Sequence, residues 1–87
     1  MNCIITGASK GLGKAMAERF AAGGYDLYLC SRNEKLLTET AQGLASGFPD
    51  ITIHHKTVDM GLREEAIGFG QWLQENQVAV DVLINNA

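Results

Sequence analysis

The sequence predicts an α/β fold in which a doubly wound parallel sheet of four strands carries three helices. Three observations predict it. Short apolar runs alternate with segments of helical period along all 87 residues, which is the pattern of β-α-β units. Glycines gather directly after the first apolar run, between Gly7 and Gly13. No repeat, low-complexity segment or linker divides the chain, so residues 1–87 are expected to lie in one domain.

The first half of the chain predicts two strands and two helices. Cys3–Thr6 and Leu27–Cys30 are the expected strands. The helix between them ends at Gly23-Gly24 and is indicated by apolar residues at helical spacing, Leu12, Ala15, Met16 and Phe20. Asn33 can cap a second helix, which stops near Gly47-Phe48-Pro49 and carries Leu37, Ala41 and Leu44.

The second half predicts an edge strand, a third helix and a last strand. Ile51–Val58 is the expected edge strand, because it contains His54, His55 and Lys56 and charge at an edge discourages stray pairing. The third helix is marked by Leu62, Ala66, Phe69 and Leu73, and the last strand by Val80, Val82, Leu83 and Ile84. Because crossovers between parallel strands are right-handed, the strand order should be 3-2-1-4, with a ligand-binding switch point between strands one and four.

Composition excludes several classes of function. A net charge of −3 disfavours nucleic acid and anionic membranes as partners, and no apolar run is long enough to span a bilayer. Met1 leads into the first strand without a basic leader, and the two cysteines lack metal-type spacing. Side chains of the adjacent His54 and His55 face opposite ways on a strand. We therefore expect a cytoplasmic protein without nucleic-acid, membrane or metal partners.

The glycine-rich turn is the first candidate binding site. Thr6-Gly7-Ala8-Ser9-Lys10-Gly11-Leu12-Gly13 joins the first strand to the first helix. Glycine permits a tight turn and a close approach of a pyrophosphate, which the helix N-terminus stabilises. A plain glycine-rich turn is the alternative. An ATP-type P-loop is rejected, because Ala15 offers no hydroxyl for Mg²⁺.

Three motifs together resemble the short-chain dehydrogenase/reductase family. The turn is similar to that family's T-G-x-x-x-G-x-G signature, Val58-Asp59-Met60 to its aspartate after strand three, and 81–87 to its D-x-L-x-N-N-A-G segment without the last glycine. The resemblance covers the whole chain and implies a Rossmann-type sheet that binds a nicotinamide cofactor. It places these residues at the cofactor: Gly7, Ser9, Lys10, Gly11, Leu12, Gly13, Ser31, Arg32, Asp59, Met60, Asn85, Asn86 and Ala87. A role for Asp59 as a turn or cap residue is equally open on structural grounds.

The end of the second strand predicts NADP(H) as the cofactor. NAD-binding folds place an acidic residue there, whereas this chain has Ser31 and Arg32. An arginine can bind the 2′-phosphate of NADP through its planar donors. Lys10 resembles a second basic residue of NADP-preferring relatives. A solvated arginine before a helix is the alternative.

No catalytic residue is assigned. The family's catalytic asparagine, serine, tyrosine and lysine follow the N-N-A-G segment, so the chain is expected to be the N-terminal part of the domain and inactive alone. The resemblance implies an enzyme that interconverts a small-molecule carbonyl and an alcohol and that assembles as a homo-oligomer. A dinucleotide-binding sensor or scaffold without catalysis is the alternative function.

Overall fold

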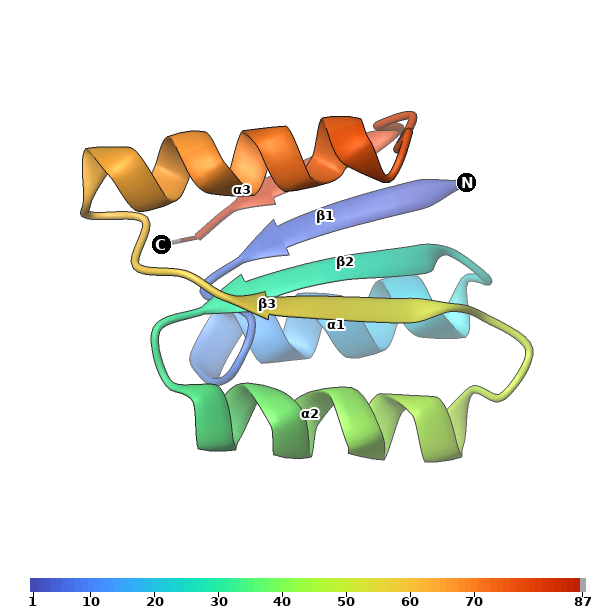
Figure 1. The fold of residues 1–87 in the computed structure, drawn as a ribbon. Coiled ribbons are helices and arrows are strands. Elements are labelled where there is room, and N and C mark those ends of the chain that lie inside the picture. The colour runs from blue at the N-terminus through green and yellow to red at the C-terminus, as the bar shows by residue number, and fades with distance from the viewer. Residues whose placement is uncertain (87) are drawn as a thin grey trace.

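Strands and helices alternate along the chain in the computed structural model, which describes residues 1–86. The elements are β1 (Asn2–Thr6), α1 (Gly11–Ala22), β2 (Asp26–Ser31), α2 (Glu34–Gly47), β3 (Ile53–Thr57), α3 (Arg63–Glu75) and β4 (Val82–Asn85). The strands are parallel and form one sheet in the order β3-β2-β1-β4, which confirms the predicted topology. Figure 1 shows α1 and α2 on one face of the sheet and α3 on the other.

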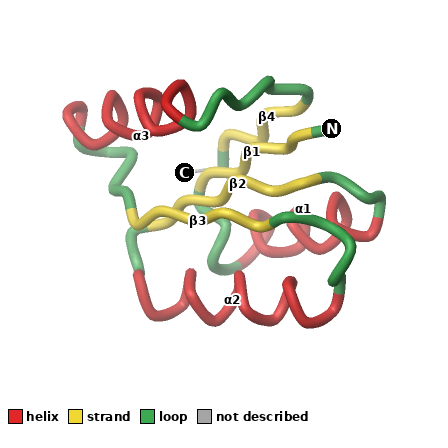
Figure 2. Tube along the Cα trace, turned by 45° about the vertical axis from the view of Figure 1, so that its right-hand side comes forward, coloured by secondary structure: helices red, strands yellow, loops and turns green. Residues whose placement is uncertain are grey.

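The strand register brings the carboxyl ends of the strands to one edge. Thr6 of β1 lies beside Cys30 of β2 and Asn85 of β4, and Ser31 lies beside Thr57 of β3. All three connections that lead from a strand into a helix leave the sheet at this edge (Figures 1 and 2). Residues in these connections are therefore brought close together.

Side chains of β1 alternate between two cores, as the period of a strand requires. Cys3 and Ile5 face α1 and α2, while Ile4 faces α3. The larger core also holds Ala8, Ala17, Ala21, Leu27, Leu29, Leu37 and Leu44. The smaller core, under α3, is formed by Ile4, Cys30, Val58 and Phe69.

The buried face of α1 is only partly the predicted one: Met16 and Phe20 are half-buried and pack against the larger core as expected, and the other two predicted residues do not pack there. Gly13, Ala17 and Ala21 are its buried residues, whereas Leu12 is 66% exposed and Ala15 is exposed. Both sets of residues have helical spacing, so hydropathy alone could not separate them. The small side chains face the sheet, where they let the helix approach closely.

Four apolar residues lie outside the regular structure predicted for them, and one of these, Val58, directly follows β3. Ile51 precedes β3, because its backbone N–H bonds the carbonyl of Phe48 at the end of α2 (3.3 Å). Val80 precedes β4 and is 52% exposed, and Leu62 is the N-cap residue of α3. Among the described residues, no helix is both long and apolar enough to cross a membrane.

Candidate functional site

A hollow of about 420 Å³ lies at the carboxyl edge of the sheet. Segments that follow each of the strands contribute to its lining: Gly7, Ser9, Lys10, Ser31, Arg32, Val58, Asp59, Met60, Gly61 and Asn86. Its volume is in the range of small-molecule sites. Most of the residues predicted to bind a cofactor thus meet in one cavity. Gly11, Leu12, Gly13 and Asn85 do not line it, and Ala87 lies outside the described residues.

The glycine-rich turn presents the N-terminus of α1 to this edge. Gly7 and Gly11 have φ values of 62° and 59°, a left-handed conformation that glycine adopts without strain. Lys10 is the N-cap residue and makes no side-chain capping bond, and the first turn of α1 contains no acidic residue. A Cβ atom on Gly11 would meet nothing within 4 Å. The first-turn N–H groups and the helix dipole can therefore stabilise an anion close to the backbone.

Gly13 serves packing inside the protein. It is buried, and a Cβ atom there would collide with the carbonyl group of Gly7 and approach Nδ2 of Asn86. The sequence predicted that its missing side chain would let a pyrophosphate approach. In the structure the missing side chain lets α1 lie against the turn and the end of β4.

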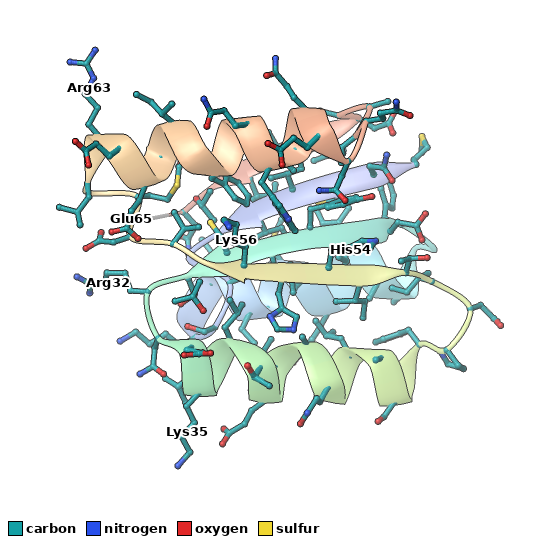
Figure 3. The ribbon with its side chains drawn as sticks, in the orientation of Figure 1. Arg32, Lys35, His54, Lys56, Arg63 and Glu65 are labelled. Atoms are coloured by element: carbon teal, nitrogen blue, oxygen red, sulfur yellow. The ribbon has the colours of Figure 1, made fainter. Side chains whose placement is uncertain are left out.

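Two hydroxyl groups and two cations lie where the turn meets the end of β2. The Oγ atoms of Ser9 and Ser31 are 2.6 Å apart in a buried hydrogen bond. A second hollow of about 280 Å³ adjoins them, lined by Ser9, Lys10, Ser31, Arg32, Asn33 and Leu36. Lys10 and Arg32 are exposed, and within residues 1–86 neither side chain has a hydrogen-bond or ion-pair partner. Figure 3 shows Arg32 extending outward at the carboxyl edge.

Asp59 shapes the turn that follows β3. Its Oδ1 accepts a hydrogen bond from the backbone N–H of Gly61 (2.9 Å), and its own N–H donates to Oε1 of Glu65 (3.0 Å). The turn role that the sequence left open is therefore present, and Asp59 also lines the larger hollow. Val58 and Gly61 line it too and were missed as site residues. Their position directly after β3 was the available signal.

The end of β4 is bonded to the glycine-rich turn. The buried hydroxyl of Thr6 donates to Oδ1 of Asn85 (3.0 Å) and accepts from the backbone N–H of Asn86 (2.9 Å). Nδ2 of Asn86 donates to the carbonyl of Gly7 (3.4 Å). The first and last motifs of the sequence therefore form one hydrogen-bonded unit.

The two cysteine thiols and the aromatic rings of α3 serve packing. Cys3 and Cys30 are buried free thiols. Burial raises the pKa of each to about 11, and a hydrogen bond from the backbone of Gly7 partly opposes the shift at Cys30, so neither is poised as a nucleophile. Phe69 is buried and stacks on Trp72 (5.6 Å between ring centroids). Within residues 1–86, no three potential metal ligands gather in one place.

Comparison with known proteins identifies relatives along the whole chain. The family model described as short chain dehydrogenase matches residues 1–87. An uncharacterized oxidoreductase of Mycobacterium tuberculosis is 40% identical over 84 residues, which are 97% of this chain and 33% of that protein. Dehydrogenase/reductase SDR family member 7B of Bos taurus is 40% identical over 88 residues, covering 97% of this chain and 27% of that protein. The chain thus spans about a third of the length of such relatives.

Solved structures share the fold closely. YwfH, an NADPH-dependent reductase involved in bacilysin biosynthesis, superposes with a TM-score of 0.93 at 28% identity, covering 98% of this chain and 35% of that one. L-sorbose reductase from Gluconobacter frateurii, solved with NADPH and L-sorbose, has a TM-score of 0.91 at 31% identity, covering 99% of this chain and 32% of that one.

Proposed function

This chain belongs to the short chain dehydrogenase family, and we propose that it forms the NADP(H)-binding part of an enzyme that interconverts a carbonyl and an alcohol. The relatives support an oxidoreductase, and two of the structural neighbours are described as NADPH-dependent or NADPH-bound. The substrate is a small molecule in this proposal.

The observation that carries the choice of NADP(H) is the residue pair at the end of β2. Ser31 and Arg32 stand where a carboxylate would accept hydrogen bonds from the ribose hydroxyls of NAD. Arg32 and Lys10 both line the two adjoining hollows, and neither is neutralised by an ion pair within residues 1–86. A phosphate group at the ribose 2′ position would bring its charge to these two cations.

The remaining lining residues fit the other parts of a dinucleotide. The open N-terminus of α1, with Gly7 and Gly11, suits the pyrophosphate. Asp59 and Met60 would border the adenine, and Asn86 the adjacent ribose. When bound, the nicotinamide supplies or accepts a hydride. Turnover also needs a proton donor beside the substrate, and we assign none within residues 1–86.

The proposal is tested by comparing the affinities for NADPH and NADH. We expect NADPH to bind at least about tenfold more tightly, since a hydrogen bond to a charged group contributes about 1.5–3 kcal/mol. Arg32→Asp should narrow or reverse this preference in a fluorescence titration. Arg63→Asp is the matched control, because Arg63 is exposed on α3 and lines neither hollow. Equal affinities of the unaltered protein for both nucleotides would contradict the proposal.

We also propose that the protein acts in the cytoplasm. The two free, buried thiols fit a reducing compartment. A homo-oligomeric assembly is part of the same proposal, and sedimentation of the full-length protein would test it.

A further inference from the structure

Few buried side chains hold α3 on its face of the sheet, where it is the only described helix (Figure 1). Within residues 1–86, α3 buries only Phe69, whereas α2 buries four residues. Its other ring, on Trp72, is half-buried and meets Tyr28 of β2 edge-on, with ring centroids 6.0 Å apart. Because the stability of a helix in a protein comes mainly from packing of its apolar face, α3 is held less firmly than α2.

The sequence of α3 also favours the helical state weakly. Gly68 and Gly70 are inside the helix, and each lowers helix formation about fivefold relative to alanine. A Cβ atom on either glycine would meet nothing within 4 Å, so packing does not require glycine there. The N-cap residue, Leu62, has no polar side-chain atom for capping. Beyond the C-terminal end, Gln77 has a φ of 54°, a left-handed conformation that glycine usually occupies.

The first turn of α3 is hydrogen-bonded to one wall of the larger hollow. Oε1 of Glu65 accepts a hydrogen bond from the backbone N–H of Asp59 (3.0 Å), and Oδ1 of Asp59 accepts one from the N–H of Gly61 (2.9 Å). Asp59, Met60 and Gly61 all line the hollow. Figure 3 shows Glu65 beside the connection between β3 and α3. Opening of the first turn of α3 therefore breaks the Glu65 bond and releases the turn that forms this wall.

We propose that α3 opens locally while the rest of the sheet stays folded, and that the bond between Glu65 and Asp59 couples this opening to occupancy of the hollow. A ligand that contacts the closed turn binds the closed state of α3 better than the open state, so it stabilises α3. The coupling is reciprocal, since closure of α3 then favours the ligand by the same factor. The choice of NADPH as the ligand rests on the proposed function, whereas the opening itself does not.

Hydrogen exchange of the backbone amides in the free protein tests the opening. We expect protection factors in α3 to be at least about tenfold lower than those in α2, because α3 opens without global unfolding. The double variant Gly68→Ala, Gly70→Ala should raise the protection of α3 by about tenfold or more. Gly43→Ala, at an open position inside α2, is the matched control and should leave α3 unchanged. Equal protection of α2 and α3 in the unaltered protein would overturn local opening.

The same measurement with saturating NADPH tests the coupling. We expect NADPH to raise the protection of α3 at least about fivefold in the unaltered protein and by less than about twofold in Glu65→Ala. Glu64→Ala is the matched control, because Glu64 carries the same charge in the same helical turn and has no hydrogen-bond partner within residues 1–86. It should keep the full effect of NADPH. Glu65→Gln retains an acceptor oxygen and should also keep it.

The outcomes separate this inference from the proposed function. If NADPH does not bind in a fluorescence titration, the proposed function fails and the coupling fails with it, while exchange in the free protein still decides whether α3 opens. Binding of NADPH without a change in α3 protection would overturn the coupling alone. An equal effect of NADPH in Glu65→Ala and Glu64→Ala would overturn the role of Glu65. Circular dichroism verifies that each variant is folded.

Discussion

Thr6 shows how a single side chain holds the candidate site together. It ends β1, is 2% exposed, and bonds both to the side chain of Asn85 and to the backbone of Asn86. Asn86 in turn bonds Gly7, whose left-handed conformation starts the turn into α1. The position of the turn therefore depends on the hydroxyl of Thr6 as well as on the glycines.

Thr6→Val should destabilise the protein although valine has nearly the same shape. The change leaves the Asn86 N–H and the Asn85 side chain without their partner, at a cost of about 1–3 kcal/mol in the free energy of unfolding. Thr57→Val is the matched control, since Thr57 is exposed on β3 and valine suits a strand. Denaturant unfolding measures both. Equal free energies for the two variants would show that the hydroxyl of Thr6 does not stabilise this edge.

At the scale of elements, α2 is the helix whose ends the sequence specifies best. Asn33 accepts a hydrogen bond from the backbone N–H of Leu36 (3.0 Å), as its capping role predicts. Glu34 follows in the first turn, where its charge complements the helix dipole. Asn33 also lines the smaller hollow, so the cap fixes where α2 begins relative to Arg32.

Two substitutions on α2 should change stability in opposite directions. Asn33→Ala removes the cap and should cost about 1 kcal/mol in the free energy of unfolding. Gly43→Ala should add about 0.5–1 kcal/mol, because Gly43 is inside the helix and a Cβ atom there meets nothing within 4 Å. Thermal and denaturant unfolding of each variant measure the changes. Stabilisation by Asn33→Ala would contradict the capping role.

Elements with their own local signal were predictable from the sequence, and contacts between distant elements were not. The cap at Asn33 and the order of the strands follow from local chemistry and from alternation. Hydropathy could not choose between Ala15 and Ala17 for the buried face of α1, because the two residues are identical in type. The Ser9–Ser31 bond depends on how β1 and β2 align, which no local pattern states.

For the molecule as a whole, the distribution of charge matters more than its sum. The chain has a net charge of −3, yet Lys10 and Arg32 outnumber Asp59 in the lining of the larger hollow. The open N-terminus of α1 adds positive potential at the same edge. An acidic protein can therefore attract an anionic nucleotide to one edge of its sheet.

The two edges of the sheet differ in how well they are protected from other chains. At one edge, β3 exposes His55, Lys56 and Thr57, and a charged, polar edge discourages pairing. At the other edge, β4 pairs with β1 and, within residues 1–86, with no second strand. Leu83 on β4 is 59% exposed. The unpaired backbone N–H and C=O groups of β4 and the apolar side chain of Leu83 are thus both accessible to another chain.

We expect a preparation of these 87 residues to self-associate through β4, most simply as a two-fold dimer in which β4 pairs with its own copy. Leu83→Lys should weaken this association, since it removes the exposed apolar side chain and places like charges near the pairing edge. Thr57→Lys, on the polar edge strand β3, should leave the association unchanged. Sedimentation across a range of concentrations distinguishes these results, with circular dichroism to verify folding. A folded monomer of the unaltered chain at high concentration would refute pairing through β4. It would show that the unpaired backbone groups of β4 and the exposed Leu83 side chain stay in contact with water without causing association.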